Sequence, residues 1–208
     1  MRGKIHAVTA MKISHWVRFA AASACIALSA CSINPLGDDH PADRWAADFE
    51  SSALWKVTNS TPISYVLLPQ TFSVRTPQHA RTVVAGRDLT LRARFSLLAE
   101  PIARGPESAY LGFAAGPSLE YWFAGKKASC YASAGGGFGA IDSTDVVGGQ
   151  GQDLTLNWYA AGGVRYYPKP DFSVNAGVFF QHLSNGGATD PNPGLNAVGP
   201  VIGLSWSF

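Results

Sequence analysis

The feature that most constrains this sequence is an alternation of large apolar residues with small or polar ones. A period of two is the repeat of a β-strand, whose successive side chains point to opposite faces. The pattern is broken by turn residues into eight segments, at about residues 53–60, 63–75, 88–100, 108–123, 128–141, 153–167, 171–184 and 197–208. No helical period and no apolar run of transmembrane-helix length accompanies them. The sequence therefore predicts an all-β chain.

The composition of the two strand faces distinguishes a membrane protein from a soluble one. In segment 88–100, Leu89 and Phe95 face one way, whereas Arg92 and Arg94 face the other. Charged residues make up 14% of the chain, against about 25% in soluble domains. A small barrel in lipid turns its large apolar face outward and fills its narrow interior with small and polar side chains. The expected inward charges are Arg92, Arg94, Glu100, Glu120 and Arg165.

We therefore predict an eight-stranded antiparallel up-and-down transmembrane β-barrel of the bacterial outer membrane over residues 53–208. A lipocalin-like barrel with an apolar lumen is the soluble alternative. Aromatic residues near the strand ends predict an interfacial girdle. These residues are Trp55, Tyr65, Tyr121, Trp122, Tyr166, Tyr167 and Trp206.

The ends of the barrel carry two further expectations. An even strand count places both termini in the periplasm, and the terminal Phe208 resembles the signal read by the outer-membrane barrel assembly machinery. A net charge of +2 without a Lys/Arg cluster argues against nucleic-acid binding. The sequence leaves open whether the barrel is a monomer or a homodimer.

The first 30 residues resemble a secretory signal peptide. Lys12 and Arg18 precede a short apolar run at 19–28, and Met1 or Met11 can be the start. The run ends in Leu-Ser-Ala-Cys, which suits signal peptidase I or a lipobox that lipidates Cys31. Residues 31–52 hold Pro, Gly and Asp before any clear alternation, so they are expected to form a periplasmic tether.

Cysteine and histidine spacing predicts neither a disulfide framework nor a metal site, and no cofactor is expected. Cys25 leaves with the leader, and lipidation of Cys31 would leave Cys130 without a partner. The five histidines are scattered, with none at i+2 or i+4 from another.

A candidate catalytic stretch lies at residues 181–196. His182 and Ser184 are two apart on the seventh predicted strand, so they share a face. That strand runs outward, which places both side chains at the outer-leaflet rim, facing lipid. A base beside a hydroxyl is the minimum for nucleophilic acyl chemistry. The structural alternative is an ordinary polar strand end followed by an Asn-Gly-Gly loop.

The stretch His-x-Ser-Asn, with Asn192 eight and Gly194 ten residues after Ser184, resembles the lipid A 3-O-deacylase (PagL-type) family. Similarity to first-hairpin sequences at residues 53–57, Pro62 and Tyr65 extends the resemblance. It implies hydrolysis of the ester-linked 3-acyl chain of lipid A in lipopolysaccharide, in the outer leaflet and without metal or cofactor. His182 would be the general base and Ser184 the nucleophile.

The same resemblance assigns Asn185, Gly187 and Asn192 to the neighbourhood of the oxyanion. It also reveals a departure, because Asn196 stands where the family has a Glu that orients the histidine. Asn196 can serve as a weaker third member, Asp190 can substitute, or activity has been lost or changed.

The main alternative function is a catalytically weak or inactive barrel with a structural or adhesive role. A transport barrel is disfavoured because side chains fill an eight-stranded lumen.

Overall fold

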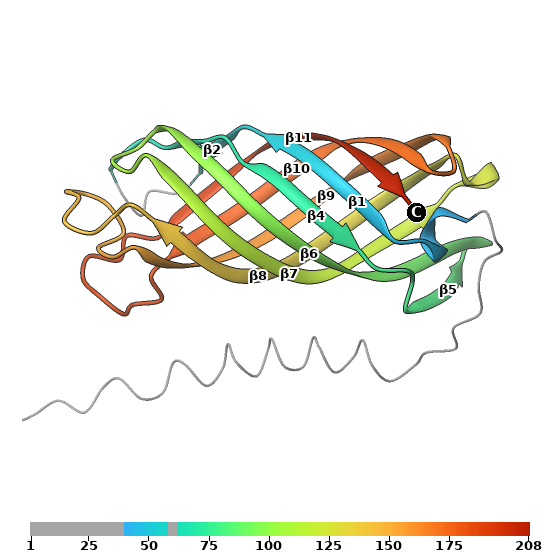
Figure 1. Ribbon diagram of the computed structural model, residues 1–208, viewed down its shortest axis with the longest axis horizontal. Coiled ribbons are helices and arrows are strands. Elements are labelled where there is room, and N and C mark those ends of the chain that lie inside the picture. Colours follow the sequence, from blue (N-terminus) through green and yellow to red (C-terminus); the bar gives the residue numbers. More distant parts are fainter. Residues whose placement is uncertain (1–39, 58–61) are drawn as a thin grey trace, which may run out of the picture. The chain divides into compact units, whose positions relative to one another are not determined.

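The computed structural model describes residues 40–57 and 62–208, which form one closed antiparallel β-barrel (Figure 1). The predicted leader, Cys31, both candidate start methionines, and residues 31–39 and 58–60 lie outside the described residues. The barrel strands are β1 (Ala46–Ser52), β2 (Leu54–Lys56), β3 (Val66–Leu67), β4 (Gln70–Arg75), β6 (Arg87–Arg104), β7 (Ala109–Trp122), β8 (Ala128–Ile141), β9 (Leu154–Lys169), β10 (Phe172–Ser184) and β11 (Leu195–Ser207).

Two pairs of these strands continue one another end to end, so the barrel wall has eight strand positions, which we call staves. This confirms the predicted fold. The first stave is β1 continued by β2, and the second is β3 continued by β4. β1 pairs with β4 on one side and with β11 on the other, so the last strand closes onto the first. The remaining pairs are also antiparallel: β2 pairs with β11, β3 and β4 pair with β6, and the strands from β6 to β11 pair in sequence order. No helix in residues 40–57 and 62–208 is long and apolar enough to cross a membrane.

Two strand boundaries differ from the sequence-based expectation. The first strand begins at Ala46, inside the stretch expected to be a tether. The sequence did not indicate a strand there because its outward residues Ala47, Phe49 and Ser51 are mostly small and show little apolar alternation. The segment predicted at 63–75 is interrupted at Pro69, whose carbonyl accepts a hydrogen bond from the Ser52 amide.

A further strand was not expected. β5 (Ala80–Val84) pairs with residues 87–91 of β6 and lies beyond the end of β4, which pairs with residues 94–99 of β6 (Figure 1). Gly86 sits in its turn with φ of +73°, a left-handed conformation that favours glycine.

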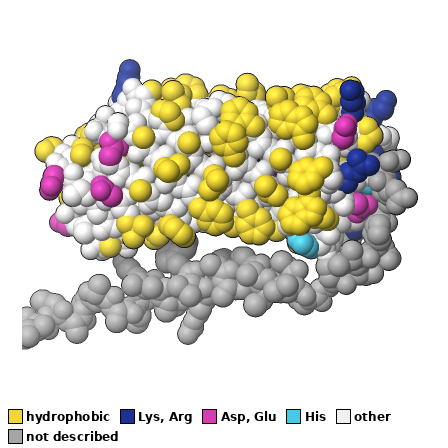
Figure 2. Space-filling model, viewed as in Figure 1, with side chains coloured by type: hydrophobic (Ala, Val, Ile, Leu, Met, Phe, Trp, Pro, Cys, Tyr) yellow, Lys and Arg dark blue, Asp and Glu magenta, His cyan; other side chains and the backbone are white. Residues whose placement is uncertain are grey.

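The outward face is apolar, as predicted. Figure 2 shows a broad hydrophobic band on the barrel side, with charged side chains gathered toward the two ends. Its members include exposed Phe95, Leu97, Leu111, Phe138, Leu156, Val164, Val178 and Ile202. A band of this kind between charged ends is typical of a barrel that spans a bilayer.

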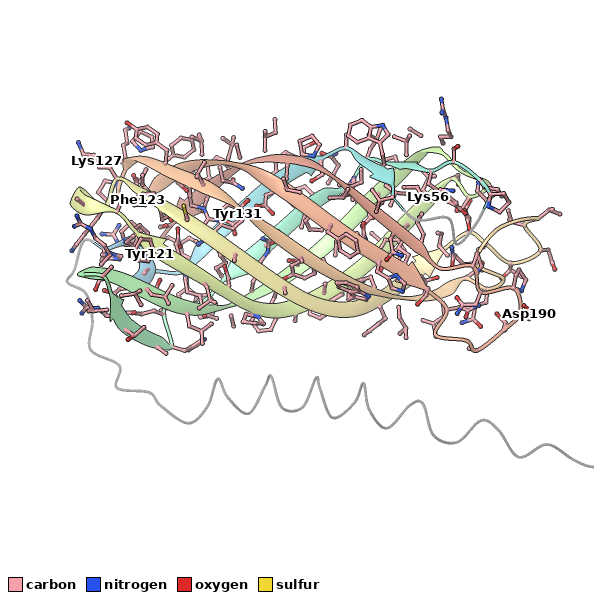
Figure 3. The ribbon with its side chains drawn as sticks, turned by 180° about the vertical axis from the view of Figure 1, so that it is seen from behind. Lys56, Tyr121, Phe123, Lys127, Tyr131 and Asp190 are labelled. Carbon is pink, nitrogen blue, oxygen red and sulfur yellow. The ribbon has the colours of Figure 1, made fainter. Side chains whose placement is uncertain are left out.

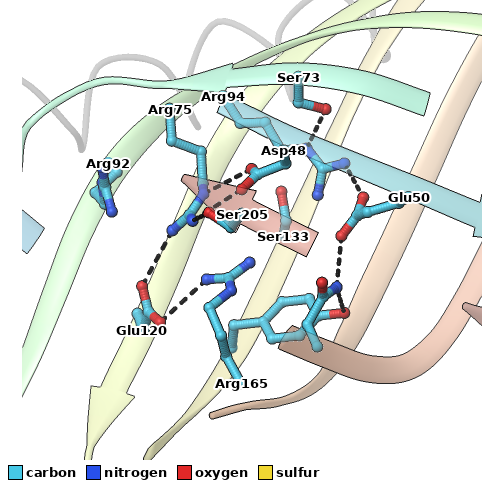
Figure 4. Close-up of polar contacts among 12 residues, drawn as sticks. Asp48, Glu50, Ser73, Arg75, Arg92, Arg94, Glu120, Ser133, Arg165 and Ser205 are labelled. Atoms are coloured by element: carbon cyan, nitrogen blue, oxygen red, sulfur yellow. Dashed lines mark hydrogen bonds and ion pairs between the residues drawn. The ribbon is translucent and has the colours of Figure 1, made fainter. Parts of the chain in front are cut away.

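The lumen is filled by paired charges (Figure 4). Arg75 contacts Asp48 at 2.7 Å and Glu120 at 3.3 Å, and Glu120 also contacts Arg165 at 3.0 Å. Arg94 pairs with Glu50 in the same interior. The five charges predicted to point inward are all buried. Burial of ions is tolerated here because each charge in this cluster has an opposite charge or hydrogen-bond partner.

Only some of the aromatic residues predicted to form the interfacial girdle lie on the outward face. Trp55, Tyr121, Tyr166 and Trp206 face outward or are only partly covered, whereas Tyr65, Trp122 and Tyr167 are buried. Leu98, which breaks the alternation in its segment, also points inward and joins the apolar core near the long loops.

A short segment before β1 packs at the end of the barrel where the first strand begins and the last strand ends. Its 3-10 helix η1 (Pro41–Asp43) follows His40, whose ring Nδ1 accepts a hydrogen bond from the Ala42 amide at 3.1 Å. The His40 ring meets Trp122 edge-on with ring centroids 4.5 Å apart. The Arg92 side chain donates to the carbonyls of Thr76 and Arg44. We call this end the terminus end and the segment 40–44 the plug.

The opposite end carries the longer connections. Residues 142–153 and 185–194 link strands there, together with the four-residue connection 105–108, whereas residues 123–127 and 170–171 make turns at the terminus end. We call this the loop end.

Candidate active site

His182 and Ser184 lie at the loop end of the barrel, among the last residues of β10. Both are half-buried and lie on the outward face, whereas the adjacent Gln181 and Leu183 point into the barrel. The alternation of this strand therefore sets the two candidate catalytic groups on one surface, as the spacing predicted.

Asn196 lies directly across from His182. The β10–β11 hairpin pairs these two residues in register, so their side chains share the outward face. His182 Nδ1 and Asn196 Oδ1 are 2.8 Å apart. An amide oxygen can only accept, so in a neutral ring this contact requires the proton on Nδ1 and leaves the lone pair on Nε2. That is the tautomer a general base needs.

Trp158 holds the other side of the imidazole. It pairs with His182 across the β9–β10 ladder, and the two ring centroids are 5.7 Å apart. Trp158 also packs on Phe180 at 4.9 Å. The sequence alone does not link Trp158 to the site, because the link depends on the register between two strands.

Gly194 completes the surroundings of the ring. Its φ is +62°, and a Cβ there would lie 3.6 Å from His182 Cε1. The chain therefore turns into β11 close beside the imidazole, with a conformation that suits glycine.

The described hydrogen bonds do not include one between His182 and the Ser184 hydroxyl. Asn196 occupies Nδ1, so Nε2 is the nitrogen left for Ser184 or a substrate. Catalytic hydrogen bonds are often long or poorly aligned in the absence of substrate, so same-face placement is the relevant feature of this pair.

The three residues assigned to the oxyanion region have different contacts. Asn185 is buried, and its Nδ2 donates inside the loops, to the carbonyls of Gln150 at 2.7 Å and Thr189 at 3.0 Å among others. The Gly187 amide donates to Asn185 Oδ1 at 2.8 Å. Asn192 is exposed, and its Oδ1 accepts from the Asn185 amide at 3.1 Å, which leaves its Nδ2 facing away from that bond.

Asp190 is exposed in the same loop, at the loop end of the barrel (Figure 3). Within residues 40–57 and 62–208, no hydrogen bond or ion pair joins Asp190 to the His182 imidazole, whose Nδ1 is bound by Asn196. The same ranges contain no cluster of three His, Cys, Asp or Glu arranged to hold a metal ion. Cys130 is a free, exposed thiol on β8.

Comparison with known proteins gives a family match and several similar folds. The model of the family described as "Lipid A 3-O-deacylase (PagL)" matches residues 71–205. The crystal structure of the outer membrane enzyme PagL aligns with a TM-score of 0.51 and 20% identity, over 76% of this chain and 97% of that one. No curated protein matched in a search of such proteins.

Another solved barrel gives a weaker alignment. Ail, the attachment invasion locus protein of Yersinia pestis, aligns at a TM-score of 0.43 and 13% identity, over 80% of this chain and 99% of that one. The family match covers most of the barrel and includes His182, Ser184, Asn192 and Asn196.

Proposed function

Because the chain belongs to the lipid A 3-O-deacylase (PagL) family, we propose that it is an outer-membrane esterase that removes the 3-linked acyl chain of lipid A by Ser-His catalysis. The observation that carries this proposal is the His182–Asn196 contact of 2.8 Å, with Ser184 on the same outward face. Lipopolysaccharide would approach laterally from the outer leaflet, with both chain termini in the periplasm. The arrangement of long loops at one end and short turns at the other supports this orientation.

The chemistry follows from the roles of the three groups. His182 Nε2 takes the proton of Ser184 Oγ as that oxygen attacks the ester carbonyl. The tetrahedral oxyanion receives a hydrogen bond from Asn192 Nδ2, which the Asn185 amide orients by binding Oδ1. Collapse breaks the bond between the carbonyl carbon and the sugar oxygen, and that oxygen takes the proton from His182 to leave as the sugar hydroxyl. Water then hydrolyses the acyl-serine, again with His182 as base.

In this proposal Asn185 and Gly187 shape the loop and Asn192 donates to the oxyanion. The side-chain amide of Asn185 is engaged with loop carbonyls, and the Gly187 amide is engaged with Asn185. Asn196 serves as the third member in preference to Asp190, because it alone of the two contacts the imidazole.

Fatty-acid release from lipopolysaccharide tests the proposal. Purified barrel is expected to release 3-linked fatty acid detectable by mass spectrometry, and Ser184→Ala is expected to lower the rate by at least about 10³-fold. Ser51→Ala, which removes another outward serine hydroxyl, is expected to retain wild-type release. Release that survives Ser184→Ala unchanged would contradict the assignment of the nucleophile.

A second candidate is a structural or adhesive barrel with little activity. It is favoured by the amide at position 196, which cannot stabilise an imidazolium by charge. Absence of any release from the wild-type protein would support it.

A further inference from the structure

A buried carboxylate joins the connections at the loop end. Glu107 lies between β6 and β7 and is 3% exposed. Its Oε2 accepts from the Tyr65 hydroxyl at 2.9 Å, and its Oε1 accepts from the Ser143 hydroxyl at 3.0 Å and the Gln150 amide at 3.1 Å. Three connections far apart in sequence therefore meet on one side chain.

Glu107 has no ion-pair partner within the described part of the chain, so these hydrogen bonds carry its stabilisation. The Ser143 hydroxyl also lies 2.5 Å from the Gln150 amide, which closes a tight cluster around the carboxylate. A buried carboxylate held only by hydrogen bonds fixes the positions of its donors, since loss of any donor exposes an unpaired charge to a poorly solvated environment.

Gln150 links Glu107 to the candidate active site through two hydrogen bonds. Its amide binds Glu107, and its carbonyl accepts from Asn185 Nδ2 at 2.7 Å. Asn185 directly follows Ser184, and its own amide orients the Asn192 side chain. The backbone of Gln150 therefore connects the Glu107 carboxylate to the loop that carries the oxyanion donor.

The same two loops also touch directly. Gly151 has a φ of +79°, and a Cβ at that position would lie 2.5 Å from the Pro191 carbonyl oxygen. By contrast, a Cβ at Gly148, in the same connection and also at positive φ, would meet Ile63 and not the 185–194 loop.

We propose that Glu107 is a positioning residue for catalysis, which through Gln150 and Asn185 holds loop 185–194 in the conformation that presents Asn192 beside Ser184 and His182. This inference rests on the proposed function. The partners of Glu107 lie in connections and not in the barrel ladder, so its loss is expected to alter the loop and leave the strands paired.

Kinetics with matched carboxylate variants test the proposal. Glu107→Ala is expected to lower kcat for fatty-acid release at least about 10-fold with little change in KM, since small displacements of catalytic groups cost rate. Glu107→Gln keeps an acceptor oxygen and is expected to stay within about 3-fold of wild type. Asp142→Asn is the control, because Asp142 also binds loop amides, at Ser108 and Ala109, without contacting Gln150 or Asn185.

Substitution of two glycines, Gly151 and Gly148, tests the direct contact between the two loops. Gly151→Ala is expected to lower kcat by a similar factor, because its methyl group would displace the Pro191 carbonyl. Gly148→Ala imposes the same backbone strain in the same connection and is expected to change kcat by less than about 3-fold. Equal effects of Gly148→Ala and Gly151→Ala would indicate general loop disorder and would overturn the proposal.

Hydrogen exchange separates this inference from the proposed function. Amides of residues 185–194 are expected to exchange at least about 10-fold faster in Glu107→Ala than in wild type or Asp142→Asn, with strand amides unchanged. If wild-type protein releases no fatty acid, the proposed function fails while this measurement still decides the linkage. Unchanged exchange in 185–194, or unchanged kcat in a folded Glu107→Ala barrel, overturns the role of Glu107.

Discussion

At the scale of single residues, the distinguishing feature is an amide where the family pattern has a carboxylate. Asn196 holds His182 in the tautomer that leaves Nε2 free, through the 2.8 Å contact with Nδ1. In the proposed mechanism this contact orients the ring, whereas an amide adds no charge that stabilises the protonated ring. These two contributions can be separated, since an aspartate at position 196 has nearly the shape of asparagine and restores the charge.

We expect Asn196→Asp to raise kcat for fatty-acid release about 10-fold, which corresponds to roughly 1.4 kcal/mol of transition-state stabilisation. Asn196→Ala is expected to lower kcat by about 10² or more through loss of orientation. The measurement is the initial rate of release from lipopolysaccharide at pH 7. Asp190→Asn serves as the control and should match wild type, because Nδ1 of the imidazole is bound by Asn196 and not by Asp190.

Much of the site could be predicted from spacing, and the rest depends on register and loop contacts. His182 and Ser184 share a face because a strand repeats every two residues. Asn196 could be matched by its distance from Ser184, but its position opposite His182 follows from the hairpin pairing. The Glu107 cluster could not be predicted, since irregular loops have no periodicity to indicate which residues meet.

At the scale of elements, the strands followed their pattern wherever large apolar residues marked the outward face. Segments 128–141, 153–167 and 171–184 agree closely with β8, β9 and β10. β1 was mistaken for part of a tether because Asp48 and Glu50 resemble loop residues until the lumen supplies Arg75 and Arg94 as partners. The acidic residues of that segment are interior residues of the barrel.

The plug provides a pH-dependent element at the terminus end. Burial, reinforced by the charge of Lys126, lowers the pKa of His40 from 6.5 to about 4. The docked plug therefore binds fewer protons than a released plug between these values. Its stabilisation is complete above about pH 6.5 and is lost as the pH falls toward 4.

Hydrogen exchange at residues 40–45 measures this effect. Exchange, corrected for its intrinsic pH dependence, is expected to become faster between pH 6.5 and 4 in the wild-type protein. In His40→Asn the same correction should give a flat profile, because asparagine can still accept the Ala42 amide but does not titrate. A flat profile in the wild type would show that protonation of His40 does not release the plug.

At the scale of the whole molecule, the lumen network connects strands from both ends of the sequence. Glu120 on β7 accepts from Arg165, Tyr167 and Ser129, and lies 3.3 Å from Arg75. Arg75 in turn reaches Asp48 on β1 and Ser205 on β11. The network therefore ties the two strands that close the barrel to its far wall.

We expect Glu120→Ala to lower the free energy of unfolding by about 3–5 kcal/mol, since it leaves two buried guanidinium groups short of a partner. Urea unfolding in lipid or detergent measures the change. Asp88→Asn breaks the exposed pair with Arg81 and is expected to cost less than about 1 kcal/mol. Similar losses in the two variants would contradict a stabilising role for the interior network.

The filled interior also bears on membrane permeability. Guanidinium and carboxylate groups meet across the lumen, so the space between the two mouths is occupied by side chains that hold one another in place. Side chains packed in this way would obstruct ions and small solutes moving through the barrel. A cell could therefore insert many copies into its outer membrane without weakening that membrane as a barrier.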